Sequence, residues 1–70
     1  MQSDSYDEFN KAVTLQKQGE LDEAIEIYDK ITKADDKFFN AFFNKAIIYY
    51  DTNYKGCDFD KAMENANQAL

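Results

Sequence analysis

The sequence lacks histidine, proline and tryptophan and has a single cysteine among its 70 residues. Without histidine there is no imidazole base for a Ser-His-Asp or Cys-His catalytic group, and the usual zinc ligand sets are out of reach. One cysteine cannot form an internal disulfide. A chain of this length buries only about 60% of the surface that its unfolded form exposes. We therefore expect a single small domain over residues 1–70 that either packs very regularly or gains contacts from something else.

Positive charge is also scarce, because eight basic residues, all lysine, face fourteen acidic ones and leave a net charge of -6. This balance argues against binding to nucleic acid or to an anionic membrane surface. No apolar run approaches the ~20 residues that a membrane-spanning helix needs. Residues 1–5 lack the basic and apolar regions of a signal peptide. A lone free thiol fits a reducing compartment, so we expect a cytoplasmic protein.

Apolar residues recur at helical spacing in four blocks of the sequence. The first, second and fourth blocks, residues 6–13, 21–31 and 59–70, each carry one apolar stripe. The third block, residues 38–50, is apolar on more than one face, which predicts a helix buried on most sides. A strand is the alternative for residues 47–50, but alanine and asparagine at three- and four-residue spacing favour helix. The sequence thus predicts an all-α fold of four antiparallel helices joined by short turns.

Polar residues and glycine mark the expected ends of these helices. Ser5 and Glu8 have the spacing of a capping box that opens the first helix. Gly19 suits the left-handed position that ends it. The acidic pair at 35–36 separates the second helix from the third, and Asp58 is expected to cap the fourth.

Two parts of the sequence recur further along the chain. Asn-Lys-Ala at residues 10–12 returns at residues 44–46, an offset of 34. Gly-Glu-Leu-Asp-Glu-Ala at residues 19–24 matches Cys-Asp-Phe-Asp-Lys-Ala at residues 57–62, an offset of 38. The chain therefore contains two similar helical hairpins, and the turn of the second, at residues 52–58, is about four residues longer.

This pattern resembles the tetratricopeptide repeat, a helix-turn-helix unit of 34 residues, in two copies. The copies cover about residues 5–38 and 39–70, and the resemblance implies two hairpins of an α-α superhelix. The matching residues are Ala12, Gly19, Ala24 and Tyr28 in the first copy, and Phe42, Asn44, Ala46, Tyr49, Phe59, Ala62 and Ala69 in the second. Three departures are Asp36 in place of proline, Cys57 in place of glycine, and Ala66 in place of an aromatic residue.

In this family the first helix of each hairpin lines a concave groove. The resemblance therefore implies a non-enzymatic protein-interaction module, an adaptor or scaffold that binds an amphipathic helix or an apolar peptide of another polypeptide. The groove positions carried over to this sequence are Tyr6, Phe9, Asn10, Val13, Lys17, Asn40, Phe43, Asn44, Ile47 and Tyr50. The alternative is that these side chains are partly core, or are covered by another part of a longer protein.

A second function hypothesis is structural. The fourth helix carries apolar residues that a following helix would cover in the family: Ala62, Met63, Ala66 and Leu70. Because about three repeats are usually needed for stability, the chain could serve oligomerisation or form the N-terminal piece of a larger repeat scaffold. Self-association is then expected, and residues 52–58 offer a hinge for exchanging helices between copies.

One subgroup of the family grips the acidic C-terminal tails of heat-shock chaperones through a basic clamp. Asn44 matches one amide of that clamp. However, Phe9 and Val13 stand where a lysine and an asparagine are needed, and no fifth helix is predicted to supply the remaining cations. An acidic chain should also repel an acidic tail, so this role ranks below the others.

The sequence offers little for catalysis or metal binding. Residues 51–56 imitate the start of an EF-hand loop, but Lys55 occupies a ligand position and Ala62 replaces the bidentate glutamate. Carboxylates are plentiful, yet none lies within an apolar block that would raise its pKa. We therefore expect no enzymatic activity, no metal site and no cofactor.

Overall fold

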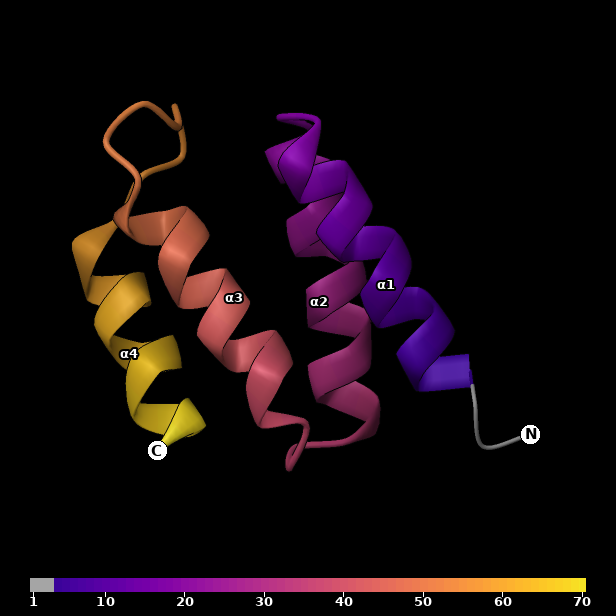
Figure 1. Ribbon diagram of the computed structural model, residues 1–70. Helices are drawn as coiled ribbons and strands as arrows, with labels where there is room; N and C mark the ends of the chain where they lie inside the picture. Colours follow the sequence, from indigo (N-terminus) through magenta and orange to yellow (C-terminus); the bar gives the residue numbers. More distant parts are fainter. Residues whose placement is uncertain (1–3) are drawn as a thin grey trace.

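The computed structural model describes residues 4–70 and contains four α-helices in this part of the chain (Figure 1). They are α1 (Asp4–Lys17), α2 (Leu21–Ala34), α3 (Phe39–Tyr50) and α4 (Phe59–Ala69). The all-α prediction is confirmed, and the strand alternative for residues 47–50 is wrong. Residues 1–3, part of the segment in which no signal peptide is predicted, lie outside the described residues.

The helices lie in chain order, and each packs on its neighbours in the sequence: α1 on α2, α2 on α3, and α3 on α4 (Figure 1). The molecule is flat, with Cα extents of 37 × 26 × 14 Å. A helix with its side chains is about 10–12 Å across, so few side chains can be covered from all sides. The loop after α3 returns α4 onto the same chain, so the helix exchange considered above is not the arrangement seen here.

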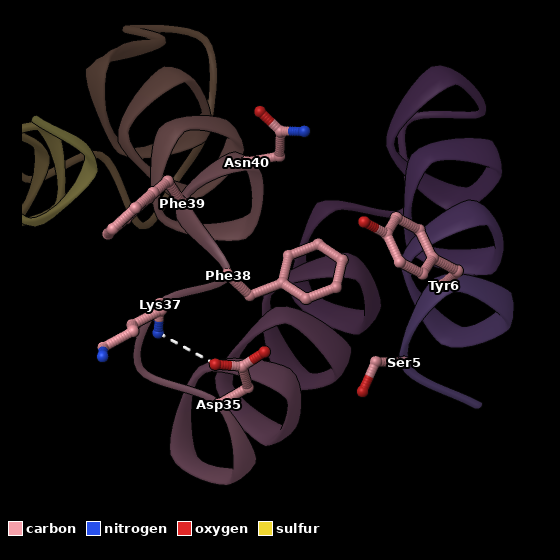
Figure 2. Close-up of a pocket in the computed structure, with 7 residues that line it drawn as sticks. All are labelled: Ser5, Tyr6, Asp35, Lys37, Phe38, Phe39 and Asn40. Atoms are coloured by element: carbon pink, nitrogen blue, oxygen red, sulfur yellow. Dashed lines mark hydrogen bonds between the residues drawn. The ribbon is translucent and has the colours of Figure 1, made fainter. Parts of the chain in front are cut away.

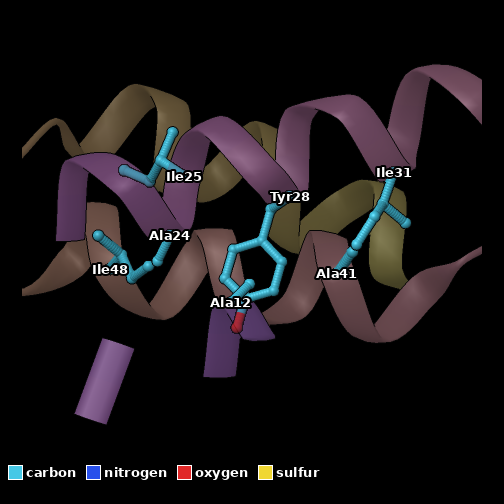
Figure 3. Packing of buried hydrophobic residues seen from close by; sticks show 7 residues of the cluster. All are labelled: Ala12, Ala24, Ile25, Tyr28, Ile31, Ala41 and Ile48. Atoms are coloured by element: carbon cyan, nitrogen blue, oxygen red, sulfur yellow. The ribbon is translucent and has the colours of Figure 1, made fainter. Parts of the chain in front are cut away.

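Alanines, isoleucines and one tyrosine from the first three helices form the core (Figure 3). The cluster consists of Ala12, Ala24, Ile25, Tyr28, Ile31, Ala41 and Ile48. Ala12, Ala24 and Ala41 are fully buried, and a methyl side chain lets neighbouring helix backbones approach closely. Tyr28 and Ile48 are the largest fully buried side chains among the described residues. The core is therefore thin and depends on few large residues.

Helix ends follow the predicted signals with one exception. Gly19 has φ of 85°, so the left-handed end of α1 is confirmed. Asp58 is the N-cap of α4, and its Oδ1 accepts a hydrogen bond of 3.1 Å from the backbone N–H of Lys61. The capping-box prediction is wrong, because α1 already begins at Asp4 and therefore includes Ser5.

The long loop between α3 and α4 is fastened to the start of α2. The hydroxyl of Tyr54 donates a hydrogen bond to Asp22, a residue 32 positions earlier, and Lys55 Nζ lies 3.8 Å from the same carboxylate. Gly56 makes room for this arrangement, since a Cβ atom there would lie 2.7 Å from the ring of Tyr54. The loop thereby ties the second hairpin to the first.

This contact predicts an alkaline transition in stability. The hydrogen bond to Asp22, helped by burial and by the negative charge, raises the pKa of Tyr54 to about 12, against about 10 in an unfolded chain. The hydrogen bond of the Tyr54 hydroxyl therefore contributes fully to the stability of the fold below about pH 10. This contribution is lost as the pH rises from about 10 to 12. We expect Tyr54→Phe to cost about 1 kcal/mol at pH 8 and progressively less as the pH rises above 10.

The measurement is urea unfolding of both proteins from pH 8 to pH 12, followed by far-UV circular dichroism. The difference between wild type and Tyr54→Phe isolates this hydroxyl, because every other tyrosine and lysine is common to both chains. Two stability curves that stay parallel through the alkaline range would contradict the proposed contact.

Candidate functional site

Large apolar side chains are exposed on three of the four helices. Those described are Tyr6 on α1, Phe39, Phe43, Ile47 and Tyr50 on α3, Phe59 and Met63 on α4, and Leu70 at its end. The prediction that the third helix is buried on most sides holds for two of its faces and fails for a third. Its neighbours α2 and α4 cover two faces and bury Ala41, Ala46 and Ile48, whereas a third face remains open. This open face is the main candidate site.

A hollow of about 290 Å³ lies between α3 and α4, and we call it the α3–α4 groove. Its lining is Ala46, Ile47, Tyr50, Phe59, Ala62, Met63 and Ala66. The alanines are the least exposed of these residues, while the rings of Tyr50 and Phe59 meet at one end with centroids 5.4 Å apart. Ile47 and Tyr50 were expected in a concave groove, and Ala62, Met63 and Ala66 on a separate face. The structure joins these two predicted surfaces into one.

The apolar surface continues along the same pair of helices. A second hollow, of about 310 Å³, is lined by Phe39, Asn40, Phe43, Ala66, Ala69 and Leu70. Ala66 belongs to both hollows, so they adjoin along α4. Phe43 and Leu70, which the sequence assigned to different surfaces, therefore lie on the same hollow.

Residues of α1 that were expected to line the groove pack differently. The ring of Phe9 lies 5.3 Å from that of Phe38 and 5.8 Å from that of Tyr28, and the ring of Tyr6 lies 5.2 Å from Phe38. Phe9 and Val13 are half-buried. This agrees with the alternative that some of the predicted groove residues belong partly to the core. Asn10 and Lys17 are exposed on α1 and line neither hollow. Phe38 is not among the predicted site residues, because its ring contacts, with Tyr6 and Phe9, come from the distant α1.

Asn44 belongs to an internal hydrogen-bond chain. Its Nδ2 donates to the hydroxyl of Tyr28 at 3.2 Å, and that hydroxyl donates to Gln16 Oε1 at 2.7 Å. Burial raises the pKa of Tyr28, which the hydrogen bond from Asn44 partly opposes. The chain links α1, α2 and α3. One N–H of the Asn44 amide is thus engaged inside the fold.

A more polar hollow of about 380 Å³ lies beside the turn between α2 and α3 (Figure 2). Its lining is Ser5, Tyr6, Asp35, Lys37, Phe38, Phe39 and Asn40. Asp35 Oδ1 accepts a 3.0 Å hydrogen bond from the backbone N–H of Lys37, which shapes the turn. The Phe38 side chain points toward Tyr6 (Figure 2). Asp35 carries the one carboxylate among these lining residues. It is exposed, and its hydrogen bond stabilises the turn.

Nothing in residues 4–70 brings metal ligands or a redox pair together. No group of three or more cysteine, aspartate or glutamate residues in this range could hold a metal ion. Cys57 is a free, half-buried thiol. None of the helices described is both long enough and apolar enough to cross a membrane.

Comparison with protein-family models, with curated proteins and with solved structures finds no match. The class is therefore defined by the fold and the site alone. It is a small all-α domain of paired helices with an apolar groove between the last two.

Proposed function

We propose that this chain is a non-enzymatic protein-interaction module that holds an apolar helix or peptide of another polypeptide in the α3–α4 groove. One observation carries the proposal. Of the eight exposed large apolar side chains described, seven lie on α3, on α4 or at the end of α4. Contiguous exposed apolar patches on small soluble domains usually mark interaction sites.

The tetratricopeptide resemblance supports the same function. Its repeated alanines at 12, 24, 46 and 62 are buried, one in each helix, and the helices pair as two successive hairpins. In this proposal α1 and α2 form the first repeat, about residues 5–38, and α3 and α4 form the second, about residues 39–70. The lengthened turn at 52–58 is then an insertion fastened to α2 by Tyr54.

The groove assignment is tested by capturing partners with Ile47→Asp, a change within the groove, and with Phe43→Ala, a change in the adjoining hollow. Ile47 lines the groove and is 46% exposed, so a buried core contact is not lost when aspartate replaces it. We expect Ile47→Asp to lower capture at least tenfold, because a charge buried at an apolar interface costs several kcal/mol. Lys33→Asp is the control, since it introduces the same side chain at an exposed position of α2. Undiminished capture by groove variants that remain helical would refute the assignment.

Self-association through α4 is the second candidate function. Met63 is 65% exposed and Leu70 fully exposed, so this helix presents an apolar stripe to solvent. In this case we expect the molar mass from sedimentation equilibrium to rise with concentration, and Met63→Asp to abolish the rise. A wild-type protein that remains monomeric at every concentration would eliminate this function and leave the groove proposal intact.

A further inference from the structure

The two hairpins are joined by the chain at one end only. The turn at residues 35–38 connects α2 to α3, and the loop at residues 51–58 lies at the opposite end of α3 (Figure 1). Because α2 has 14 residues, its start lies about 20 Å from this turn. Helix α2 also packs less extensively on α3 than the two helices of either hairpin pack on each other. We call the contact of α2 with α3 the hairpin seam; it has a connected end at the turn and an open end.

The buried residues of the hairpin seam divide between its two ends. Ala24, Ile25 and Ile48 lie at the open end, whereas Ile31 and Ala41 lie near the connected end (Figure 3). All five are buried. Native proteins open locally where few contacts hold an element. Partial separation of the hairpins would therefore begin at the open end, while the turn keeps the other end together.

The loop at residues 51–58 is ordered by its own hydrogen bonds and belongs to the second hairpin. The backbone N–H groups of Asn53 and Tyr54 donate to the side chain and the carbonyl of Asp51, at 2.9 and 3.0 Å. The N–H of Asp58 donates to the carbonyl of Tyr49 at 2.9 Å, and the rings of Tyr49 and Tyr54 lie with centroids 6.4 Å apart. These contacts fix the position of the Tyr54 ring relative to α3.

The loop meets the first hairpin at one carboxylate, at the open end of the seam. Asp22 accepts the hydrogen bond of the Tyr54 hydroxyl and lies 3.8 Å from Lys55 Nζ. The side chains of Asp22 and Lys55 are 63% and 86% exposed, so their ion pair is weak and the hydrogen bond is the stronger contact. Asp22 precedes the buried Ala24 by two residues. The contact therefore closes the open end and is released without removing any core side chain.

We infer that residues 51–58 form a latch that controls local opening of the hairpin seam at its open end. When Tyr54 leaves Asp22, the start of α2 and the buried Ile48 reach water more often, while the connected end keeps its protection. The α3–α4 groove lies within the second hairpin, so this inference does not depend on the proposed function.

The test is amide hydrogen exchange of the 70-residue chain, followed by NMR. The reporters are Ile48 at the open end and Ile31 near the connected end, which are 2% and 3% exposed. Asp22→Ala removes both contacts of the latch. Gly56→Ala releases it from the loop side, because the new Cβ would lie 2.7 Å from the Tyr54 ring and displace it. We expect each variant to speed exchange about fivefold at Ile48 and to leave Ile31 unchanged.

A single and a double variant serve as controls. Glu23→Ala changes the net charge equally, and Glu23 is an exposed residue in the same first turn of α2. Tyr54 and Lys55 bond to its neighbour Asp22, so we expect Glu23→Ala to leave exchange at both reporters unchanged. Asp22→Ala/Gly56→Ala is expected to exchange no faster than Asp22→Ala alone, because both changes release the same contact.

Each other result overturns the inference. Equal acceleration at Ile48 and Ile31 shows that the loop stabilises the whole fold and not one end of the seam. Unchanged exchange at Ile48 shows that the loop does not control opening. If Asp22→Ala lowers the helical circular dichroism signal, Tyr54→Phe, which removes only the hydroxyl, decides between the same outcomes. None of these results bears on the groove function, which partner capture with Ile47→Asp decides.

Discussion

Replacing Tyr28 by alanine is expected to lower the free energy of unfolding by about 3–5 kcal/mol, measured by urea unfolding. The side chain is fully buried and lies at the centre of the core (Figure 3). Its ring packs against Phe9, and its hydroxyl bonds with Gln16 and Asn44. Removing a buried aromatic side chain costs about 3–5 kcal/mol. A domain of this size is stable by roughly 4–10 kcal/mol, so the loss amounts to between about a third and all of its stability.

Tyr28→Phe separates the hydroxyl from the ring. The ring stays in place, but Gln16 Oε1 and Asn44 Nδ2 lose the partner that connects α1 to α3. We expect this variant to fold and to be about 1–2 kcal/mol less stable in urea unfolding. Tyr50→Phe is the matched control, because Tyr50 is 69% exposed, and its loss of the hydroxyl should be neutral. A Tyr28→Phe protein as stable as wild type would show that the hydrogen-bond chain contributes nothing.

The second large effect is expected at the ion pair between α2 and α3. Lys45 Nζ lies 2.8 Å from Asp29 Oδ1, and only 10% of the lysine side chain is exposed. The ammonium also lies 5.4 Å from the centre of the Phe42 ring. Asp29→Ala leaves this mostly buried cation without its anionic partner, so we expect a loss of about 2–3 kcal/mol.

Replacing both partners should restore much of that loss. In Asp29→Ala/Lys45→Met no charge remains to be desolvated, and methionine fills a similar volume. The measurement is a double-mutant cycle from urea unfolding, with Glu26→Ala as the control because Glu26 is an exposed residue of the same helix. If the changes in unfolding free energy of the two single variants add up to that of the double variant, the two residues are not coupled.

Local signals in the sequence predicted the secondary structure well. Helical spacing located four helices, Gly19 ended the first and Asp58 capped the fourth. These signals work because a helix end or an apolar stripe depends on residues three or four positions apart. The same local reasoning gave a wrong result at Ser5. Its spacing to Glu8 suits a helix cap, but α1 begins at Asp4, one residue before Ser5.

Contacts between distant residues could not be read from the sequence. The hydrogen bond from Tyr54 to Asp22 joins residues 32 positions apart, and that from Asn44 to Tyr28 joins residues 16 apart. Tyrosine, asparagine and aspartate are also ordinary surface residues. Only the packing of α3 beside α2 brings these side chains together.

The sequence predicted residues of the candidate site but not that they form one surface. Ile47, Tyr50 and Met63 were named from the repeat pattern as interaction residues, and they are exposed. The pattern assigned them to two surfaces, however, because it does not contain the relative placement of the third and fourth helices. Phe9 was expected in the groove, yet it packs largely against the Phe38 and Tyr28 rings.

The sequence by itself determined four helices, an acidic surface, and the absence of any imidazole base, since composition and local spacing suffice for these. The tertiary structure alone decided which faces are covered. A stripe of apolar residues shows that a helix has a face to bury, but burial depends on which neighbour lies against that face. In this flat arrangement the helices of residues 4–70 that pack closely on α3 are α2 and α4, on two of its sides. Its third face therefore remains open and forms the groove with α4.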